Sequence, residues 1–357
     1  MSSNLPRPAN SFDSLRLLFA LLVIVTHSFA LVGLADPLEV YTELTYDFGK
    51  LGVTGFFAMS GYLVTRSWLG NPNPFRFILA RAMRIVPAFW LALLFSVLVA
   101  SIANPHPLEF LLDELTWHWV WRNAFFIWHG YSSMTPGAFA NNPIPGGANG
   151  SLWTLTYELY CYAAIGLLGI ARVFTRPQWI WILVAVLLVF YYKLILSDPS
   201  AFRMAYHDLY LAFATGMVVA LRGYRAGILL VAVAFACTAL GAALEFPTAH
   251  RWIAPTQVLI AVAVIRLANS TWLSHLAFPS GDYSYGLYVY AFPVQQLIIA
   301  CYGPTTPPPL TAALTVAATL PFAMLSWHCV EKRALEFVRT ASKRWPLLKK
   351  RKPIPHP

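Results

Sequence analysis

Ser14 to Ala35 reads SLRLLFALLVIVTHSFALVGLA, an apolar run broken by only two ionisable residues, Arg16 near its start and His27 further along. A helix that crosses the hydrocarbon core of a bilayer needs about 20 mostly apolar residues, and this run supplies them. No small-residue cleavage pattern clearly follows the run, so a removed signal sequence is not expected. The stretch therefore predicts a membrane-spanning helix that carries a buried histidine.

Similar apolar runs continue along the chain. Hydrophobic residues make up 58% of the 357, and charged residues only 11%, against roughly 25% in a soluble domain. These runs predict an all-α membrane protein of about ten spans. The expected spans are 14–35, 51–69, 85–103, 151–171, 178–197, 205–221, 226–244, 254–268, 283–302 and 310–329.

The distribution of Lys and Arg predicts the orientation. With the N-terminus in the cytoplasm and alternating spans, 20 of the 25 basic residues lie inside and five outside, as the positive-inside rule requires. Both termini are then cytoplasmic. The net charge of +10 is a topology signal, and no folded basic domain for nucleic acid is present. We expect one membrane domain over 1–335 and a basic, proline-containing cytoplasmic tail over 336–357, disordered from Lys343 and anchored to anionic lipid headgroups.

His27 is the most informative residue of the first span. Ionisable side chains at membrane depth are costly, so they are usually functional or paired. Arg16 lies eleven residues earlier, and eleven residues turn a helix about three times, so the two share a face roughly 16 Å apart. The alternative is a histidine packed against a backbone carbonyl.

Glu158 is the one carboxylate that falls clearly inside an expected span. It follows Ser151 by seven residues, which places it roughly 10–12 Å below the outer surface, the depth also expected for His27. The two side chains can meet if their helices adjoin. The alternative is a hydrogen bond between packed helices.

A basic run lies between the second and third expected spans, at Arg76, Arg81 and Arg84. The positive-inside rule explains any one of them. Guanidinium is also the natural binder of phosphate. A phosphorylated donor arriving from the cytosol would meet this cluster first.

The expected outer loops offer weaker signals. Acids in the first loop are either simply solvated or hydrogen-bond a polyhydroxylated acceptor. The aromatic stretch Trp117–Trp121 is either an interfacial helix or a surface on which sugar rings stack. The loop acids are Asp36, Glu39, Glu43 and Asp47.

The positions of the cysteines do not indicate a disulfide framework. All four lie in or at the ends of apolar segments, so buried reduced thiols are expected rather than disulfides. No paired metal-ligand spacing occurs, and no metal site is expected. The four are Cys161, Cys237, Cys301 and Cys329.

Five segments, spread nearly end to end and in order, resemble the motifs of the acyltransferase-3 family of bacterial membrane acyltransferases. Many members of that family also carry a histidine in the late motif, where this chain has Ala291-Phe292-Pro293. A role for that late histidine cannot apply here, which puts more weight on His27. The matching segments are Phe12–Arg16 with His27, Gly52–Tyr62, Arg81–Pro87, Ser151–Tyr160 and Gly281–Tyr288.

The resemblance implies transfer of an acyl group, acetyl by default, from cytosolic acyl-CoA to a hydroxyl of an extracytoplasmic or surface glycan. Acyl-CoA is then a donor substrate and not a resident cofactor, and the location is the bacterial cytoplasmic (inner) membrane. His27 suits the chemistry because its unperturbed pKa lies near 6.5, as general base or as acyl carrier. The expected site comprises His27 and Glu158 for catalysis, Arg16, Arg81 and Arg84 for the donor, and Trp153, Glu43 and Ser151 for the acceptor.

Two other classes of protein also fit a polar, many-span chain. One is a transporter or flippase of a small or lipid-linked sugar, although neither paired broken helices nor a duplicated half is apparent. The other is a glycosyltransferase using a lipid-linked sugar, but no Asp-x-Asp motif occurs. Hydrolysis of acyl-CoA would separate the enzyme from the transporter. The acceptor glycan and the oligomeric state stay open.

Overall fold

A computed structural model describes residues 11–42, 46–125, 130–176, 178–179, 181–182, 205–243, 252–274 and 281–349. These residues are helical or irregular, with a single isolated bridge between Met134 and Gly147 and no strand among them. The predicted all-α class is therefore confirmed. The helices are α1 (Phe12–Ala30), α2 (Pro37–Tyr41), α3 (Phe48–Gly70), α4 (Pro74–Ile102), α5 (Pro107–Leu112), α6 (Glu114–Ala124), α8 (Thr154–Ile170), α10 (Ala205–Arg222), α11 (Tyr224–Ala243), α12 (Ile253–Ala268), α13 (Ser284–Tyr302), α14 (Pro308–Ser326) and α15 (Lys332–Arg344).

The lengths and apolar character of these helices define a multi-pass membrane protein. Three helices are long and apolar enough to cross a bilayer by themselves: α1, α4 and the continuous helix Pro308–Arg344. Shorter apolar helices occur at Thr154–Ile170, Tyr224–Leu240 and Ile253–Ala268. The count of ten and the cytoplasmic placement of both ends stay predictions. Of the expected span 178–197, all but four residues lie outside the described part of the chain.

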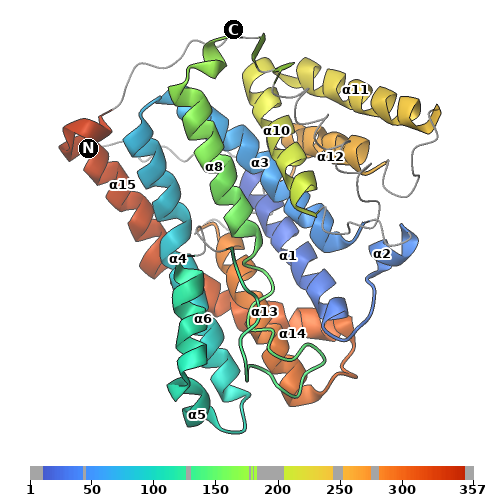
Figure 1. Ribbon diagram of the computed structural model, residues 1–357, viewed down its shortest axis with the longest axis vertical. Helices are drawn as coiled ribbons and strands as arrows, with labels where there is room; N and C mark the ends of the chain where they lie inside the picture. The colour runs from blue at the N-terminus through green and yellow to red at the C-terminus, as the bar shows by residue number, and fades with distance from the viewer. Residues whose placement is uncertain are drawn as a thin grey trace.

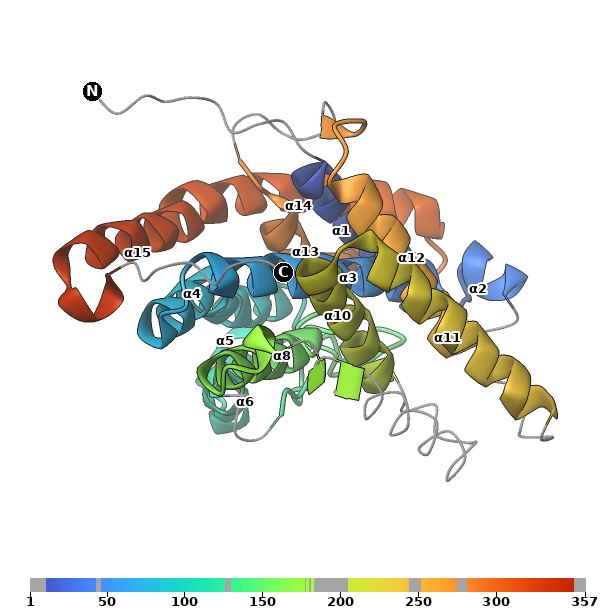
Figure 2. The ribbon, with the colours of Figure 1, turned by 90° about the horizontal axis from the view of Figure 1, so that it is seen from above.

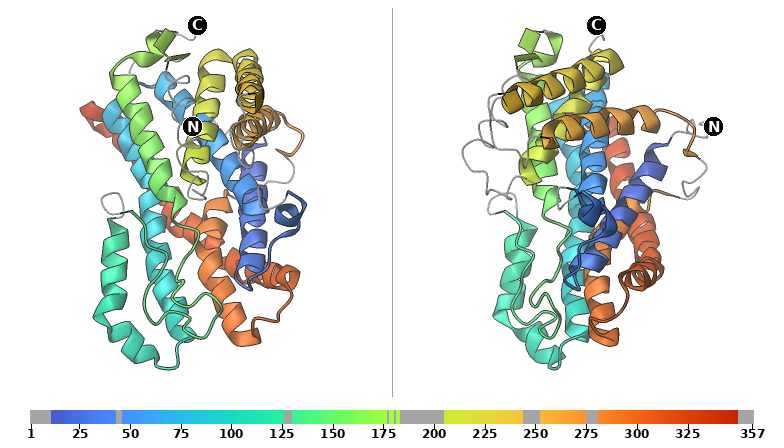
Figure 3. Two further views of the ribbon diagram at one scale, coloured as in Figure 1. Left: turned by 45° about the vertical axis from the view of Figure 1, so that its right-hand side comes forward. Right: turned by 90° about the vertical axis from the view of Figure 1, so that its right-hand side faces the viewer.

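The helices form a bundle whose centre is shared by α1, α3 and α13 (Figures 1 and 2). α3 packs against α1 and α10, while α13 packs against α14, α1 and α4. α11 and α12 lie across one end of the bundle, steeply inclined to α4 and α8 (Figure 3). Segments far apart in sequence therefore meet around α1, the helix that carries Arg16 and His27.

α4 begins at Pro74, well before the expected start of the third span at residue 85. The Asn73 side chain accepts a hydrogen bond from the Arg76 amide at 3.2 Å, and Pro74 occupies the first helical position. Both features favour helix initiation. Arg81 and Arg84, which the sequence placed between two expected spans, therefore lie within α4 itself. A window of hydrophobicity marks only the apolar part of a helix, and here the helix extends beyond it.

The C-terminal region continues α14 rather than leaving the bundle. A π-helical turn, Trp327–Glu331, leads into α15, which packs along the start of α4. The Asn73 amide also donates to the carbonyl oxygens of Leu347 at 2.7 Å and Lys349 at 3.0 Å. Up to Lys349, the chain expected as a disordered anchor from Lys343 onward is instead docked on the bundle.

Candidate active site

A cavity of 110 Å³ lies at the centre of the bundle, between α1, α3, α4, α8 and the start of α13. Its walls combine apolar side chains with a concentrated set of polar ones. Glu158 and the three arginines singled out in the sequence all reach it, from α8, α1 and α4. The polar lining includes Arg16, Ser60, Arg81, Arg84, Glu158 and Tyr162.

Glu158 is held by hydroxyl groups inside this cavity. Its Oε1 accepts hydrogen bonds from the Ser60 hydroxyl, at 2.9 Å, and from the Tyr162 hydroxyl. Tyr162 follows Glu158 by four residues on α8, so both project from one face of the helix. The Arg81 guanidinium lies over the Tyr162 ring, 5.7 Å from its centroid. The carboxylate is thus fixed between α3 and α8, facing the arginines.

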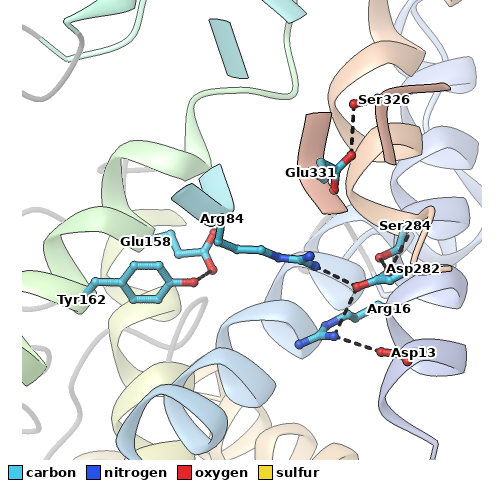
Figure 4. A network of polar contacts seen from close by, with 9 residues as sticks. All are labelled: Asp13, Arg16, Arg84, Glu158, Tyr162, Asp282, Ser284, Ser326 and Glu331. Atoms are coloured by element: carbon cyan, nitrogen blue, oxygen red, sulfur yellow. Dashed lines mark hydrogen bonds and ion pairs between the residues drawn. The ribbon is translucent and has the colours of Figure 1, made fainter. Parts of the chain in front are cut away.

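Asp282 joins two of the arginines, as Figure 4 shows. Its Oδ2 pairs with Arg84 Nη2 at 2.7 Å and with Arg16 Nη1 at 3.3 Å. The side chain is only 8% exposed, and Ser284 donates to its Oδ1 through the hydroxyl. Burial alone would raise the pKa of the Asp282 carboxyl, but Arg84 and Arg16 lower it to about 2. Arg16 also pairs with Asp13 at 3.0 Å.

Glu331 adds a further buried carboxylate near this cluster. It ends the π-helical turn, is 2% exposed, and accepts a hydrogen bond from the Ser326 hydroxyl at 3.0 Å. The Arg84 guanidinium lies 6.0 Å from the centroid of the Trp327 ring in the same turn. π-helical turns are rare and frequently occur at functional sites. The sequence analysis missed Glu331 and gave Asp282 no role. Both could have been noticed as acids next to apolar runs, because Asp282 directly precedes the expected span 283–302 and Glu331 closely follows the expected span 310–329.

His27 lies apart from the cavity, at the other end of α1. Its Nδ1 is 3.5 Å from the Ser151 hydroxyl, and its ring meets the Phe292 ring edge-on with centroids 5.1 Å apart. Within the described part of the chain, no hydrogen bond joins His27 to Glu158: His27 faces Ser151, whereas Glu158 is bound to Ser60 and Tyr162. α1 ends at Ala30, and Ser151, three residues before the start of α8, is already buried.

The segment before α8 folds into the bundle and presents Ser151 to His27. The Asn149 side chain donates to Val289 O at 2.9 Å and accepts from the Ser151 amide at 3.1 Å. Gly150 lies so close to Phe292 that a β-carbon there would approach the ring to 2.4 Å. Among the described residues, a neutral hydrogen-bonded loop thus places Ser151 beside His27.

Two residues connect the cavity with the surroundings of His27. Thr154 and Tyr288 both line the cavity, and their hydroxyl oxygens lie 2.6 Å apart. Thr154 follows Ser151 by three residues. Arg16 and His27 also lie on the same helix, about 16 Å apart along its axis. The two groups of residues are thus successive levels along α1.

The remaining residues expected to bind the acceptor are dispersed. Trp153 packs edge-on against Tyr157, with centroids 5.7 Å apart, and does not line the cavity. Glu43 lies outside the described residues. In the aromatic stretch, Trp119 is buried and donates to Ser132 O at 2.8 Å, whereas Trp121 is exposed.

Other loop residues also have structural contacts. Asp36 is buried and caps α2, and Asp47 caps α3, so neither is a merely solvated acid. All four cysteines are free; Cys161 is buried as expected, whereas Cys301 and Cys329 are exposed.

Comparison with known proteins places this architecture in one family. A family model described as an acyltransferase domain matches residues 9–328. The chain belongs to this acyltransferase-3 family, and it is an acyltransferase. It is 31% identical to an O-acetyl transferase of Shigella phage Sf6 over 341 residues, which cover 92% of this chain and 96% of that protein.

Two further relatives come from rhizobia. The exopolysaccharide production protein ExoZ of Rhizobium meliloti (strain 1021) is 28% identical over 69% of this chain and 76% of its own length. Nodulation protein 10 of Rhizobium leguminosarum bv. viciae is 31% identical over 44% of each chain. No solved structure matches the chain at a significant level.

Proposed function

We propose that the protein is an O-acyltransferase that moves an acetyl group from acetyl-CoA to a hydroxyl of a surface polysaccharide. The observation that carries the proposal is the arrangement along α1: three arginines converge on a cavity at one level, and a histidine beside a serine lies at the next. The names of the relatives, an O-acetyl transferase and an exopolysaccharide production protein, support the class of acceptor.

The donor enters at the arginine end. Arg16, Arg81 and Arg84 offer the planar, multidentate donors that bind phosphate oxygens best. The pantetheine arm extends from there along α1, which brings its thioester toward His27. In this arrangement the acceptor approaches His27 from the opposite side of the membrane.

His27 acts as the general base. Its Nδ1 faces Ser151, so Nε2 is the nitrogen for substrate. It takes the proton of the acceptor hydroxyl while that oxygen attacks the thioester carbon. The carbon–sulfur bond then breaks, and the imidazolium returns the proton to the departing thiolate. A proton transfer of this kind contributes about 10²–10⁴-fold in rate.

The reaction is tested with purified protein and acetyl-CoA, and with the surface glycan of cells that have or lack the gene. We expect release of free CoA, and loss of O-acetyl groups from the glycan when the gene is absent. Unchanged glycan and no turnover of acetyl-CoA would favour the transporter or flippase instead.

The proposal also needs a fixed orientation in the bacterial inner membrane, with both termini cytoplasmic. Its support is the charge asymmetry of the loops. In a variant without the four native cysteines, single cysteines at Ser2 and Ser133 should react with an impermeant thiol reagent from opposite sides. Equal labelling from one side would overturn this topology.

A further inference from the structure

The central cluster is already balanced in charge. Arg16 and Arg84 share Asp282, and Arg16 also holds Asp13. Arg81 makes no ion pair within the described part of the chain. Coenzyme A brings a pyrophosphate and a further phosphate on its ribose, so three arginines are few for it. The carboxylates at or beside the cluster are Asp13, Glu158, Asp282 and Glu331.

A second recess, with an excess of positive charge, lies at the turn between α3 and α4. It is an open groove of 580 Å³, closed on one side by α15. This is within the range of small-molecule sites, about 300–1,000 Å³. None of its lining residues is acidic, and in the ranges that the structure describes none of its four cations makes an ion pair. The cations are Arg66, Arg76, Arg339 and Lys343.

The groove is organised before any ligand arrives. Arg76 Nε donates to the Ser342 hydroxyl at 3.1 Å, which fixes the guanidinium between α4 and α15. Arg66 Nη1 donates to the Tyr62 hydroxyl at 2.8 Å. Asn73, which caps α4, also holds the chain that follows α15. Two of the four cations are therefore oriented by neutral hydroxyls and keep their charge available.

The groove and the cavity are separate recesses lined in part by the same two helices. On α3, Leu63 and Val64 line the cavity and Arg66 lines the groove. On α4, Arg81 belongs to the cavity and Arg76 to the groove, about 7.5 Å further along the axis. The axial separation is short compared with the length of an acyl-CoA molecule, so one donor could contact residues of both recesses.

We infer that the groove formed by Arg66, Arg76, Arg339 and Lys343 binds the 3′-phosphate of the acyl-CoA nucleotide, while the central arginines receive the pyrophosphate. The inference rests on the proposed donor. Arg66 and Arg76 lie within residues 9–328, which the family model matches, whereas Arg339 and Lys343 lie beyond them on α15. An anionic lipid headgroup is the other source of a phosphate ester at such a surface.

The test compares acetyl-CoA with acetyl-3′-dephospho-CoA, two donors that differ by one phosphate. The wild-type protein should have a KM about tenfold lower for acetyl-CoA, which corresponds to about 1.4 kcal/mol, because hydrogen bonds to charged groups are stronger than those between neutral groups. R339Q/K343Q should remove that preference by raising KM for acetyl-CoA alone, with kcat retained. The charge-conserving pair R339K/K343R should keep most of the preference. Because the readout is a ratio within one variant, a lower amount of folded protein does not change it.

The matched control removes two exposed charges from the same helix outside the groove, in K332Q/R333Q, and should keep the wild-type ratio. Equal KM values for both donors in the wild-type protein would overturn the inference while leaving the proposed function intact. So would a preference that survives R339Q/K343Q. If activity instead follows anionic lipid in vesicles and that dependence is lost in R339Q/K343Q, the groove is a lipid site. If the wild-type protein turns over neither thioester, the proposed function fails and this subsite with it.

Discussion

The two ends of α1 lie in different chemical surroundings: charged groups surround Arg16, whereas neutral groups surround His27. At the Arg16 end, a buried carboxylate, Asp282, lies between two half-buried guanidinium groups. At the His27 end, the neighbours are a hydroxyl, an aromatic edge and neutral amides. No carboxylate contacts the imidazole in the described part of the chain. The ion pairs keep the arginines and Asp282 charged. The neutral neighbours of His27 leave its imidazole able to take up and release a proton.

The His27 end should show the largest effect on activity. His27→Ala should lower acyl transfer by about 10²–10⁴-fold, because it removes the base. His27→Gln should fail similarly, since glutamine keeps hydrogen bonding but cannot accept the proton. Transfer is measured as O-acetylation of the surface glycan and as release of CoA in vitro.

Glutamine also provides the control for His27. If the histidine only packs against Ser151 and Phe292, His27→Gln should largely preserve activity. Amounts of inserted protein must match the wild type in both variants. Wild-type levels of acetylation by His27→Gln would show that the general base is another residue. The functional contrast between the two ends of α1 would then not hold.

The Arg16 end should show the largest effect on stability. Asp282→Asn leaves two half-buried guanidinium groups, 26% and 21% exposed, without their shared buried partner, so the expected cost is somewhat below the about 3–5 kcal/mol for breaking a fully buried pair. Asp13→Asn removes an ion pair of the same arginine, but its side chain is 47% exposed, so the expected cost is about 0.2–1 kcal/mol. The midpoints of thermal unfolding in detergent, at one scan rate, give the comparison. Equal midpoints for the two variants would show that Asp282 is not the centre of the network.

At the Arg16 end of α1, substitutions of the two α4 arginines should affect donor binding alike but stability differently. Arg81→Gln and Arg84→Gln should each weaken acetyl-CoA binding by about 1.5–3 kcal/mol per lost contact. Arg84→Gln should also lower the unfolding midpoint, because Arg84 makes the shorter ion pair to Asp282. Arg81→Gln should leave the midpoint nearly unchanged. Donor affinity that stays constant in an inserted double variant would leave only the positive-inside explanation for both residues.

The sequence predicts the helices of this protein better than their ends. Apolar runs locate α1, α8 and α13 within a few residues, because a span needs about 20 mostly apolar residues to cross the bilayer. The depth argument for Glu158 took Ser151 as the membrane surface, whereas Ser151 is buried beside His27. A loop that folds back into the bundle has no signature in hydrophobicity, and its hydrogen bonds through Asn149 join residues far apart in sequence.

Partners within the site were harder to predict than its members. Arg16, Arg81, Arg84 and Glu158 do line one cavity. Their counter-charge Asp282 lies 198 residues beyond Arg84, and no local spacing relates the two. The high free-energy cost of an ionisable residue in an apolar segment therefore identifies candidate site residues from the sequence. Which of them pair with one another depends on tertiary packing.

The smallest expected effects test which residue works with His27. Ser151→Ala removes one hydrogen bond at the limit of length, worth about 0.5–1.5 kcal/mol, and should slow transfer about two- to tenfold. If Ser151 acts only by orienting the imidazole, Ser151→Ala should cost nothing further in a His27→Ala background. Glu158→Gln alters a carboxylate held by Ser60 and Tyr162 at the other level of α1, so its effect should add to that of His27→Ala instead. Residual transfer rates of the three single and two double variants, measured with one glycan acceptor, decide between coupling and independence. A Glu158 effect that vanishes without His27 would mean that the two levels act as one unit.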